Sequence, residues 1–165
     1  SILDLFKKVM DTPEFKKQKE LFDLMSEMNS KDGCTTDEMP NGIGEFGLEP
    51  TNPIPTNTVH GSILYLGGLR TLDGKKVNNK RMGSLKAKNI QKPIDQYLIT
   101  DESGEQLAVI YISPYQAVNS KKAPQGLKQV SPLLWLITNE MVSLMSDNLE
   151  KYQFMSWFML KFGDN

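Results

Sequence analysis

The segment that most constrains the fold is a glycine motif followed at once by three prolines. Residues 42–47 read Gly-Ile-Gly-Glu-Phe-Gly, a formal match to the pattern G-x-G-x-x-G. In dinucleotide-binding proteins this pattern follows an apolar strand and opens a helix, whose N–H groups and dipole hold the pyrophosphate. Here a polar stretch precedes the motif, and Pro50, Pro53 and Pro55 follow it. Because proline removes a backbone donor and disfavours helix in the residue before it, the motif is predicted to lie in an irregular loop.

This loop extends over residues 29–57, which is longer than most structureless connections in a compact domain. It carries the apolar side chains Phe46, Leu48 and Ile54. Segments that stay disordered are poor in such side chains, so we expect these three to hold the loop against the body of the protein. The sequence therefore predicts an ordered loop, in which the glycines allow positive-φ turns and close packing.

The apolar pattern changes after this loop. Residues 59–66 are predicted as a strand, and Gly67-Gly68 after them favours a bulge or a close approach of backbones. A tight turn is predicted at Leu72-Asp73-Gly74-Lys75, because Asp-Gly adopts the conformations that hairpins need. Residues 81–88 alternate imperfectly between apolar and polar and are predicted as a further strand.

The clearest hairpin joins residues 94–100 to residues 107–112 through the polar residues 101–105. The second of these strands is apolar at nearly every position. We therefore expect it at the centre of the sheet, covered on both faces. A second loop, rich in Pro, Gly and Lys, follows over residues 114–130.

Helical patterns lie on both sides of the strands in the sequence. Within residues 2–28, apolar residues recur at helical spacing, and Thr12-Pro13 is typical of a helix start. Residues 131–162 begin with a similar Ser-Pro pair and continue with an apolar helical face. The periodicity of residues 150–160 fits a helix and a strand equally well, and both stay open.

The order of helices, then strands, then helices predicts an α+β fold in a single domain over residues 1–165. We expect an antiparallel sheet of four to five strands in residues 58–113. The parts around it are expected as follows: N-terminal helices in residues 2–28, the ordered loop 29–57, the loop 114–130 and C-terminal helices in residues 131–162.

Composition agrees with one ordinary globular domain, since 39% of the 165 residues are hydrophobic and 24% are charged. The single cysteine, Cys34, excludes a disulfide within the chain and a zinc site built from several cysteines. No apolar run reaches the ~18 residues of a membrane-spanning helix. We expect a cytoplasmic protein without membrane contact, and a removed signal peptide stays open because residue 1 is not Met.

Positive charge is concentrated in one stretch. Residues 61–92 carry eight Lys or Arg against the single acid Asp73, whereas the whole chain has a net charge of −1. Such a block can follow a polyanion backbone, contact an acidic protein or protect an exposed sheet edge from aggregation. Between Arg70 and Lys92, where these basic residues lie, there is no aromatic residue for base stacking, which weighs against nucleic acid.

Catalytic candidates are few. His60 is the only histidine, so any mechanism with a histidine base depends on it, and Glu45 in the glycine motif is the acid considered with it. Neither a G-x-S-x-G elbow nor a metal motif such as H-E-x-x-H or paired C-x-x-C is present. We therefore predict no metal and no cofactor, and the lack of an assembled site weighs against an enzyme.

The function favoured by the sequence is a protein-interaction or regulatory module, of the inhibitor or immunity type, that contacts a protein partner through loop 40–57. Two alternatives stay open: polyanion or RNA binding through residues 70–92, and a hydrolase using Glu45 and His60. The methionine- and aromatic-rich C-terminus is expected to form core or a homodimer face. The candidate binding residues are Gly42, Gly44, Glu45, Phe46, Gly47 and Glu49 in the loop, and Arg70, Lys80 and Arg81 in the basic stretch.

Overall fold

The structure is a computed structural model that describes residues 30–131 continuously, together with isolated positions before residue 30 (4, 7, 8, 10–13, 16, 17, 19, 20 and 24). Of residues 2–28, where N-terminal helices are expected, only those isolated positions are described. The C-terminal helices expected in residues 131–162 and the expected homodimer face lie outside the described residues, except for residue 131 itself. Within residues 30–131 the fold is α+β and contains one helix, so flanking helices are not confirmed.

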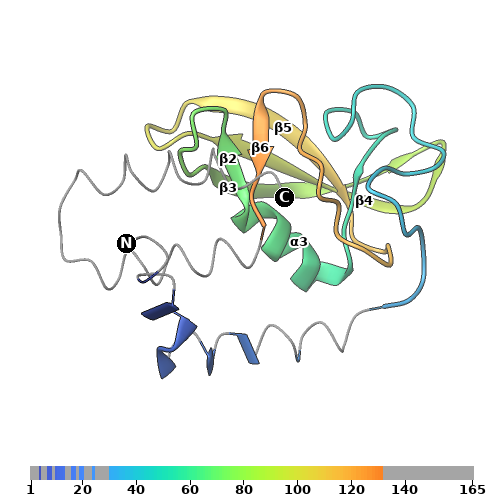
Figure 1. Cartoon of the computed structure of the whole chain (residues 1–165). Coiled ribbons are helices and arrows are strands. Elements are labelled where there is room, and N and C mark those ends of the chain that lie inside the picture. The colour runs from blue at the N-terminus through green and yellow to red at the C-terminus, as the bar shows by residue number, and fades with distance from the viewer. Residues whose placement is uncertain are drawn as a thin grey trace.

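The main sheet has four strands in the order β1-β5-β4-β3. Their bounds are Ile54–Pro55 for β1, Asn78–Ala87 for β3, Ile90–Thr100 for β4 and Gln106–Ser113 for β5. The last three are antiparallel neighbours, but β1 runs parallel to β5, so the prediction of an antiparallel sheet is wrong in this respect. A parallel pair needs a long crossover. Here the chain supplies it with the helix and the β3–β4 hairpin (Figure 1).

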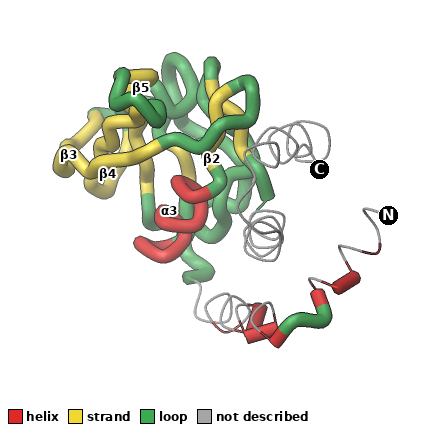
Figure 2. The backbone as a smooth tube through the Cα atoms, turned by 90° about the vertical axis from the view of Figure 1, so that its left-hand side faces the viewer, coloured by secondary structure: helices red, strands yellow, loops and turns green. Residues whose placement is uncertain are grey.

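The segment predicted as the first strand is instead a helix, α3 (Thr58–Gly67). Its buried residues are Gly61, Ser62, Tyr65 and Leu66, which form one face at helical spacing. A short apolar run such as residues 63–66 fits a strand and a buried helix equally well, which explains the error. The helix lies against one face of the sheet (Figures 1 and 2).

A small second sheet pairs β2 (Leu69–Thr71) with β6 (Leu127–Gln129) in antiparallel fashion. The predicted turn after β2 is confirmed, because the Gly74 N–H donates to the Thr71 carbonyl (2.9 Å). The return side of this turn pairs only at Lys76, opposite Arg70. Strand β6 lies inside the segment predicted as the loop 114–130.

The predicted hairpin over residues 94–112 is confirmed as β4 and β5. Strand β5 lies in the interior of the sheet, between β4 and β1, as expected. It is not covered along its whole length, however, since Leu107 is 41% exposed whereas Ile110 and Ile112 are fully buried. Burial therefore begins where β5 passes under the helix and the loops.

The hydrophobic core lies between the sheet, α3 and the small sheet. Tyr65 of α3 is at its centre, and its hydroxyl donates to the Lys122 carbonyl (2.7 Å). Burial raises the pKa of Tyr65 far above its usual range, so this hydroxyl stays protonated. The buried members of the core are Ile54, Tyr65, Leu66, Leu69, Tyr97, Ile99, Ile110, Ile112 and Leu127.

Candidate binding cleft

The glycine loop, residues 42–52, uses its backbone donors internally. Four N–H groups of the motif donate to acceptors within the loop or just before it: Gly42 to Met39 O (3.0 Å), Ile43 to Thr51 O (2.9 Å), Glu45 to a Glu49 carboxylate oxygen (3.3 Å) and Gly47 to Asn52 O (2.8 Å). A phosphate-binding loop directs such groups at its ligand. The loop therefore has the hydrogen bonding of a packed turn.

Gly47 fastens this loop to the sheet. Its carbonyl accepts from the Tyr111 N–H (2.9 Å), so the loop covers β5 beside the short strand β1. Its φ is +72°, and a Cβ there would lie 2.7 Å from Pro124 Cγ and 2.9 Å from Ile54 Cδ1. Ile54 is fully buried, and Phe46 and Leu48 pack against the core. The expectation that these three side chains hold the loop in place is confirmed.

The acid and the histidine proposed for a hydrolase are not brought together. Glu45 and Glu49 are exposed on the glycine loop, and His60 is exposed in the first turn of α3. Among the hydrogen bonds and ion pairs of residues 30–131, none joins Glu45 to His60. The described contacts give this pair no catalytic geometry.

The basic stretch does not form one surface. Arg70 is buried at 2% exposure, and Arg81 pairs with Asp95. Lys80 and Lys86 are exposed on β3, which is the edge strand of the sheet, and Lys88 follows it. This distribution agrees with the interpretation of the lysines as a solvated, protected edge.

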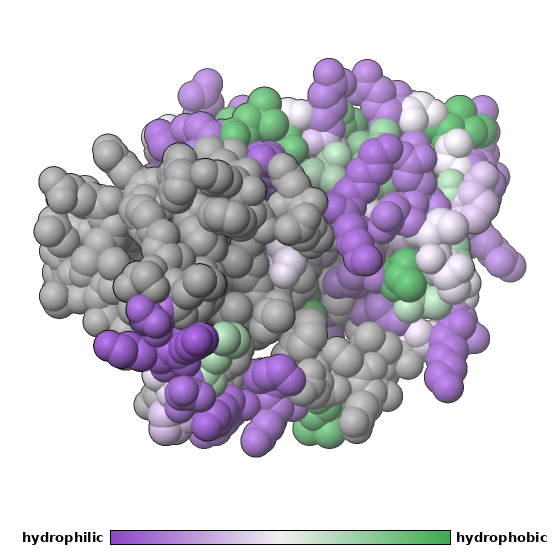
Figure 3. Space-filling view, in the orientation of Figure 1, coloured by the Kyte–Doolittle hydropathy of each residue, from purple (hydrophilic) through white to green (hydrophobic). Residues whose placement is uncertain are grey.

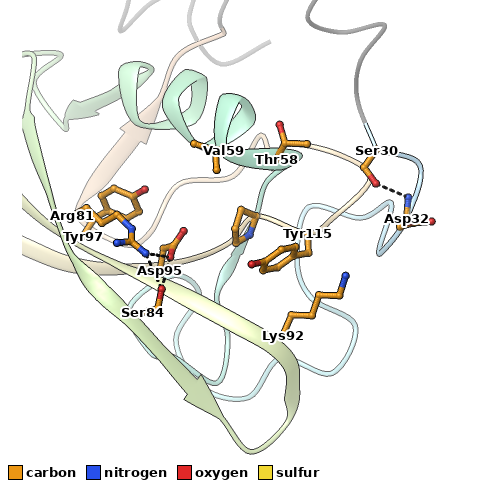
Figure 4. A pocket seen from close by; sticks show the side chains of 11 residues that line it. Ser30, Asp32, Thr58, Val59, Arg81, Ser84, Lys92, Asp95, Tyr97 and Tyr115 are labelled. Carbon is orange, nitrogen blue, oxygen red and sulfur yellow. Dashed lines mark hydrogen bonds and ion pairs between the residues drawn. The ribbon is translucent and has the colours of Figure 1, made fainter.

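A cleft of about 490 Å³ opens between the first turn of α3, the start of the loop after β5 and the β3–β4 face (Figure 4). Sequence analysis predicted only one of the residues around it, Arg81. The cleft is lined by Ser30, Asp32, Thr58, Val59, Arg81, Ser84, Lys92, Asp95, Tyr97, Pro114 and Tyr115.

A β-bulge builds the strand side of the cleft. The register of β3 against β4 shifts between Arg81 and Gly83, so that Arg81 faces Tyr97 and Ser84 faces Asp95. Residues three apart on a regular strand point to opposite faces, but the extra residue places Arg81 and Ser84 on the same face. Gly83 takes φ +140° at this bulge, and nothing lies within 4 Å of where its Cβ would be.

Arg81, Ser84 and Asp95 form a closed hydrogen-bonded triangle. Arg81 Nη2 donates to Asp95 Oδ1 and to Ser84 Oγ, both at 2.8 Å, and Ser84 Oγ donates to the same Asp95 oxygen at 2.9 Å. This hydrogen bond to Asp95 raises the pKa of Arg81. Burial, and then the Asp95 charge, raise the pKa of Tyr97 beside them. The result is a fixed polar floor in which the two charges largely neutralise each other.

The opposite side of the cleft presents an aromatic residue and an apolar one. The Tyr115 side chain is 41% exposed, and Lys92 Nζ lies 4.9 Å from its ring centroid, a cation–π contact. Val59 on α3 is 63% exposed. Figure 4 shows Tyr115 and Lys92 at one end of the cleft and the Arg81 triangle at the other.

The backbone is strained at the mouth of the cleft. Thr58, the first residue of α3, has φ +65°, the only positive φ among the described non-glycine residues. A β-branched side chain disfavours this conformation. It is held in place because the Thr58 N–H donates to the Pro114 carbonyl (2.9 Å). Strain of this kind is concentrated at functional sites.

One buried side chain holds several walls of the cleft together. Asn57 is 2% exposed, accepts from the Ser30 N–H (3.0 Å) and donates to the Ser30 carbonyl (2.7 Å). Its own N–H donates to Asn119 Oδ1 (2.7 Å), and its backbone pairs with Tyr115. Asn57 therefore connects Ser30 and Tyr115 to the start of α3.

No sequence signal identified Asp95, Ser84, Tyr115 or Asn57. A glycine inside a predicted strand suggests a bulge, and Gly83 was the one available indication that the β3 face is irregular. Comparison of the chain with family models, with curated proteins and with solved structures gave no significant match. The site is therefore argued from its geometry.

Two further properties bear on function. Within the described ranges, no three His, Cys, Asp or Glu side chains are grouped so that they could hold a metal ion. No helix among the described residues is long and apolar enough to cross a membrane. On the face shown in Figure 3, the described surface is mostly hydrophilic, with apolar side chains in separate patches.

Proposed function

We propose that this protein is a protein-interaction module and that the cleft receives a short segment of a partner chain. The observation that carries the proposal is the triangle of Arg81, Ser84 and Asp95, set on a rigid sheet beside the exposed ring of Tyr115. The volume of about 490 Å³ lies in the range of specific ligand sites and accommodates a few side chains.

The chemistry of the cleft favours a peptide over a strongly charged ligand. Arg81 and Asp95 neutralise each other, as the 2.8 Å ion pair shows, so the floor offers hydrogen-bonding groups and little net charge. Tyr115 and Val59 add apolar contact area. Tyr and Arg are the residue types most enriched at the energetic centres of protein interfaces. This combination suits a segment with both a polar backbone and an apolar side chain.

In this proposal the contact surface is formed by the β3–β4 face, the first turn of α3, the start of the loop after β5, and Ser30 and Asp32. The glycine motif contributes support, because its polar groups bond to the loop itself. The exposed residues Ile43 and Glu45 lie outside the cleft and are not needed for recognition. The proposed site is therefore the cleft beside loop 40–57, and the loop itself has a supporting role.

A displayed random peptide library tests the proposal. Peptides would be selected on the wild-type protein and then bound to Tyr115→Ala, Arg81→Gln and His60→Ala variants. We expect binding to weaken by at least ~10-fold for the first two, since interface hot spots contribute at least ~1.4 kcal/mol each. His60→Ala is the matched control, because His60 is exposed on α3 and does not line the cleft. Peptides that bind all variants equally would refute the cleft as the site.

Polyanion binding is the second candidate, supported by the exposed Lys80, Lys86 and Lys88 along the edge strand. It is weaker because Arg70 is buried and Arg81 is neutralised. Fluorescence anisotropy with a labelled single-stranded oligonucleotide at ~50 mM salt, where electrostatic binding is strong, separates the two candidates. Saturable binding that the triple variant Lys80→Gln, Lys86→Gln, Lys88→Gln abolishes would favour the polyanion function.

A further inference from the structure

Arg70 carries a positive charge into the protein interior. It is the middle residue of β2 and is only 2% exposed. Burial lowers the pKa of Arg70 to about 10, so the guanidinium still carries its charge at neutral pH. A buried charge is unfavourable unless it is paired and hydrogen-bonded, so the cost of burying Arg70 depends on its partners.

One of the three guanidinium nitrogens of Arg70 donates hydrogen bonds to the backbone. Nη1 donates to the Gly67 and Leu69 carbonyls, both at 2.7 Å, and these two bonds fix its plane. Nε and Nη2 are buried, and neither makes a hydrogen bond in the described part of the chain. The N–H groups of Nε and Nη2 point to the same side, and together they form the fork that binds a carboxylate or phosphate through two parallel hydrogen bonds.

Two further cations lie next to Arg70. Lys128 on β6 is its cross-strand partner on one side, and Lys76 is its partner on the other. Directly paired residues of antiparallel strands place their side chains on the same face, ~5 Å apart at Cβ. Lys76, Arg70 and Lys128 therefore form a cationic row across three adjacent segments, of which β2 and β6 are marked in Figure 1.

The electrostatics of the cationic row favour a bound anion. Like charges directly opposite one another destabilise a sheet. Burial and then the Arg70 charge lower the pKa of Lys76, and the acid Glu102 acts in the opposite direction. Lys76 is exposed at one end of the row, which provides a charged approach to the guanidinium from solvent.

We propose that the Nε/Nη2 fork of Arg70 binds an oxyanion, a phosphate or carboxylate group, with Lys76 and Lys128 on either side. The site is separate from the cleft, because Arg70 does not line it, and the inference does not depend on the proposed function. The anion would neutralise the buried charge and join β2 to β6 on one side and to the return side of the turn after β2 on the other.

Thermal unfolding of the full chain tests this site. Melting temperatures would be compared in sodium phosphate, sulfate, acetate and chloride at equal ionic strength. A ligand that binds only the folded state at ~10 times its Kd should raise the Tm by ~3–6 °C. Phosphate and sulfate acting without acetate would identify a tetrahedral anion, and acetate acting as well would identify a carboxylate. Equal melting temperatures in all four salts would overturn the proposal.

Two variants make the assay specific. Arg70→Lys keeps the charge but removes the fork, so the anion-dependent rise in Tm should disappear. Lys121→Gln removes one exposed charge outside the cationic row and should keep the full rise. A rise that persists in Arg70→Lys, or that disappears in Lys121→Gln, contradicts the assignment. If Arg70→Lys does not fold, ³¹P line broadening of inorganic phosphate by the wild-type chain gives the second measurement, and its absence overturns the site.

Discussion

The glycine loop and the cleft are both built from polar and loop residues, but they use their polar groups in opposite ways. In the loop, the N–H groups of Gly42, Ile43 and Gly47 donate to carbonyls within the loop or just before it. In the cleft, Arg81 and Asp95 form a hydrogen-bonded floor under an open volume of about 490 Å³. The loop therefore has the organisation of a structural part, and the cleft has that of a recognition site.

The difference shows that a glycine motif binds phosphate only where its backbone N–H groups point at the ligand, whatever its residue types. The glycine motif has the residue types of a phosphate loop, but a Cβ at Gly44 would lie 2.2 Å from a Glu49 carboxylate oxygen. The space in front of that glycine is already filled by the protein's own acid. The comparison predicts that substitutions in the loop change stability, whereas substitutions in the cleft change binding.

The largest effect is expected for Gly47→Ala. A left-handed φ costs a non-glycine residue about 1–2 kcal/mol, and the new methyl would crowd Pro124 and Ile54, which adds about 1–3 kcal/mol. We expect about 2–5 kcal/mol lower free energy of unfolding by urea titration. Gly104→Ala is the matched control, because it has φ +87° but nothing within 4 Å of the added Cβ.

In that control only the backbone strain applies, so the loss should stay near 1–2 kcal/mol. Equal losses in the two variants would show that the glycine loop is not tightly packed against the core. Peptides selected on the cleft should bind the folded fraction of Gly47→Ala with unchanged affinity. Lost affinity in the folded fraction would break the distinction between the two regions.

Asn57→Ala should affect both properties, because Asn57 connects the walls of the cleft. Removing the amide leaves the Ser30 N–H and carbonyl without their partner, which costs about 1–3 kcal/mol. We expect that loss in urea denaturation, together with weaker binding of cleft-selected peptides. Asn78→Ala is the control, since its side chain makes one exposed 3.4 Å bond to the Asp101 carbonyl. An Asn57→Ala variant as stable as the wild type would contradict the claim that this side chain holds the walls of the cleft together.

Local chemistry made part of this fold predictable. Prolines at 50, 53 and 55 exclude a helix after the glycine motif, and the alternation around residues 101–105 identifies the β4–β5 hairpin. Helix α3 was missed because its short apolar run has no unique period. Strand β6 was missed because three residues form no recognisable pattern, and their partner β2 lies far away in the sequence.

The site was less predictable than the fold because its contacts are long-range. Arg81 was identified as one of a group of cations, but its pairing with Asp95 depends on the strand register and on the bulge at Gly83. The contact of Tyr115 with Asn57 similarly depends on how two loops meet. Sequence pattern indicates which residues are charged or aromatic, and only the register determines which of them meet.

Thr58→Gly should stabilise the protein slightly. Glycine tolerates the φ of +65° that strains threonine, which recovers about 1–2 kcal/mol. The greater freedom of glycine in the unfolded chain removes about 0.5–1 kcal/mol of this gain. We expect a net gain of roughly 0–1.5 kcal/mol in urea denaturation, with weaker binding of cleft-selected peptides because the mouth loses a side chain. A loss of stability would show that Thr58 contributes contacts that outweigh its strain.

Asp95→Asn should have the smallest effect on stability and a large effect on recognition. The Arg81 side chain is 52% exposed and that of Asp95 is 15% exposed, and ion pairs with an exposed partner contribute about 0–1 kcal/mol. Asparagine keeps the shape and one acceptor, so we expect a change below about 1 kcal/mol in urea denaturation. The floor would gain an uncompensated Arg81 charge, and cleft-selected peptides should bind at least ~10-fold more weakly. Asp101→Asn, in the β4–β5 turn outside the cleft, should leave their affinity unchanged. If Asp95→Asn instead lowers stability as far as Gly47→Ala while peptide binding persists, the triangle is a structural clasp like the glycine loop.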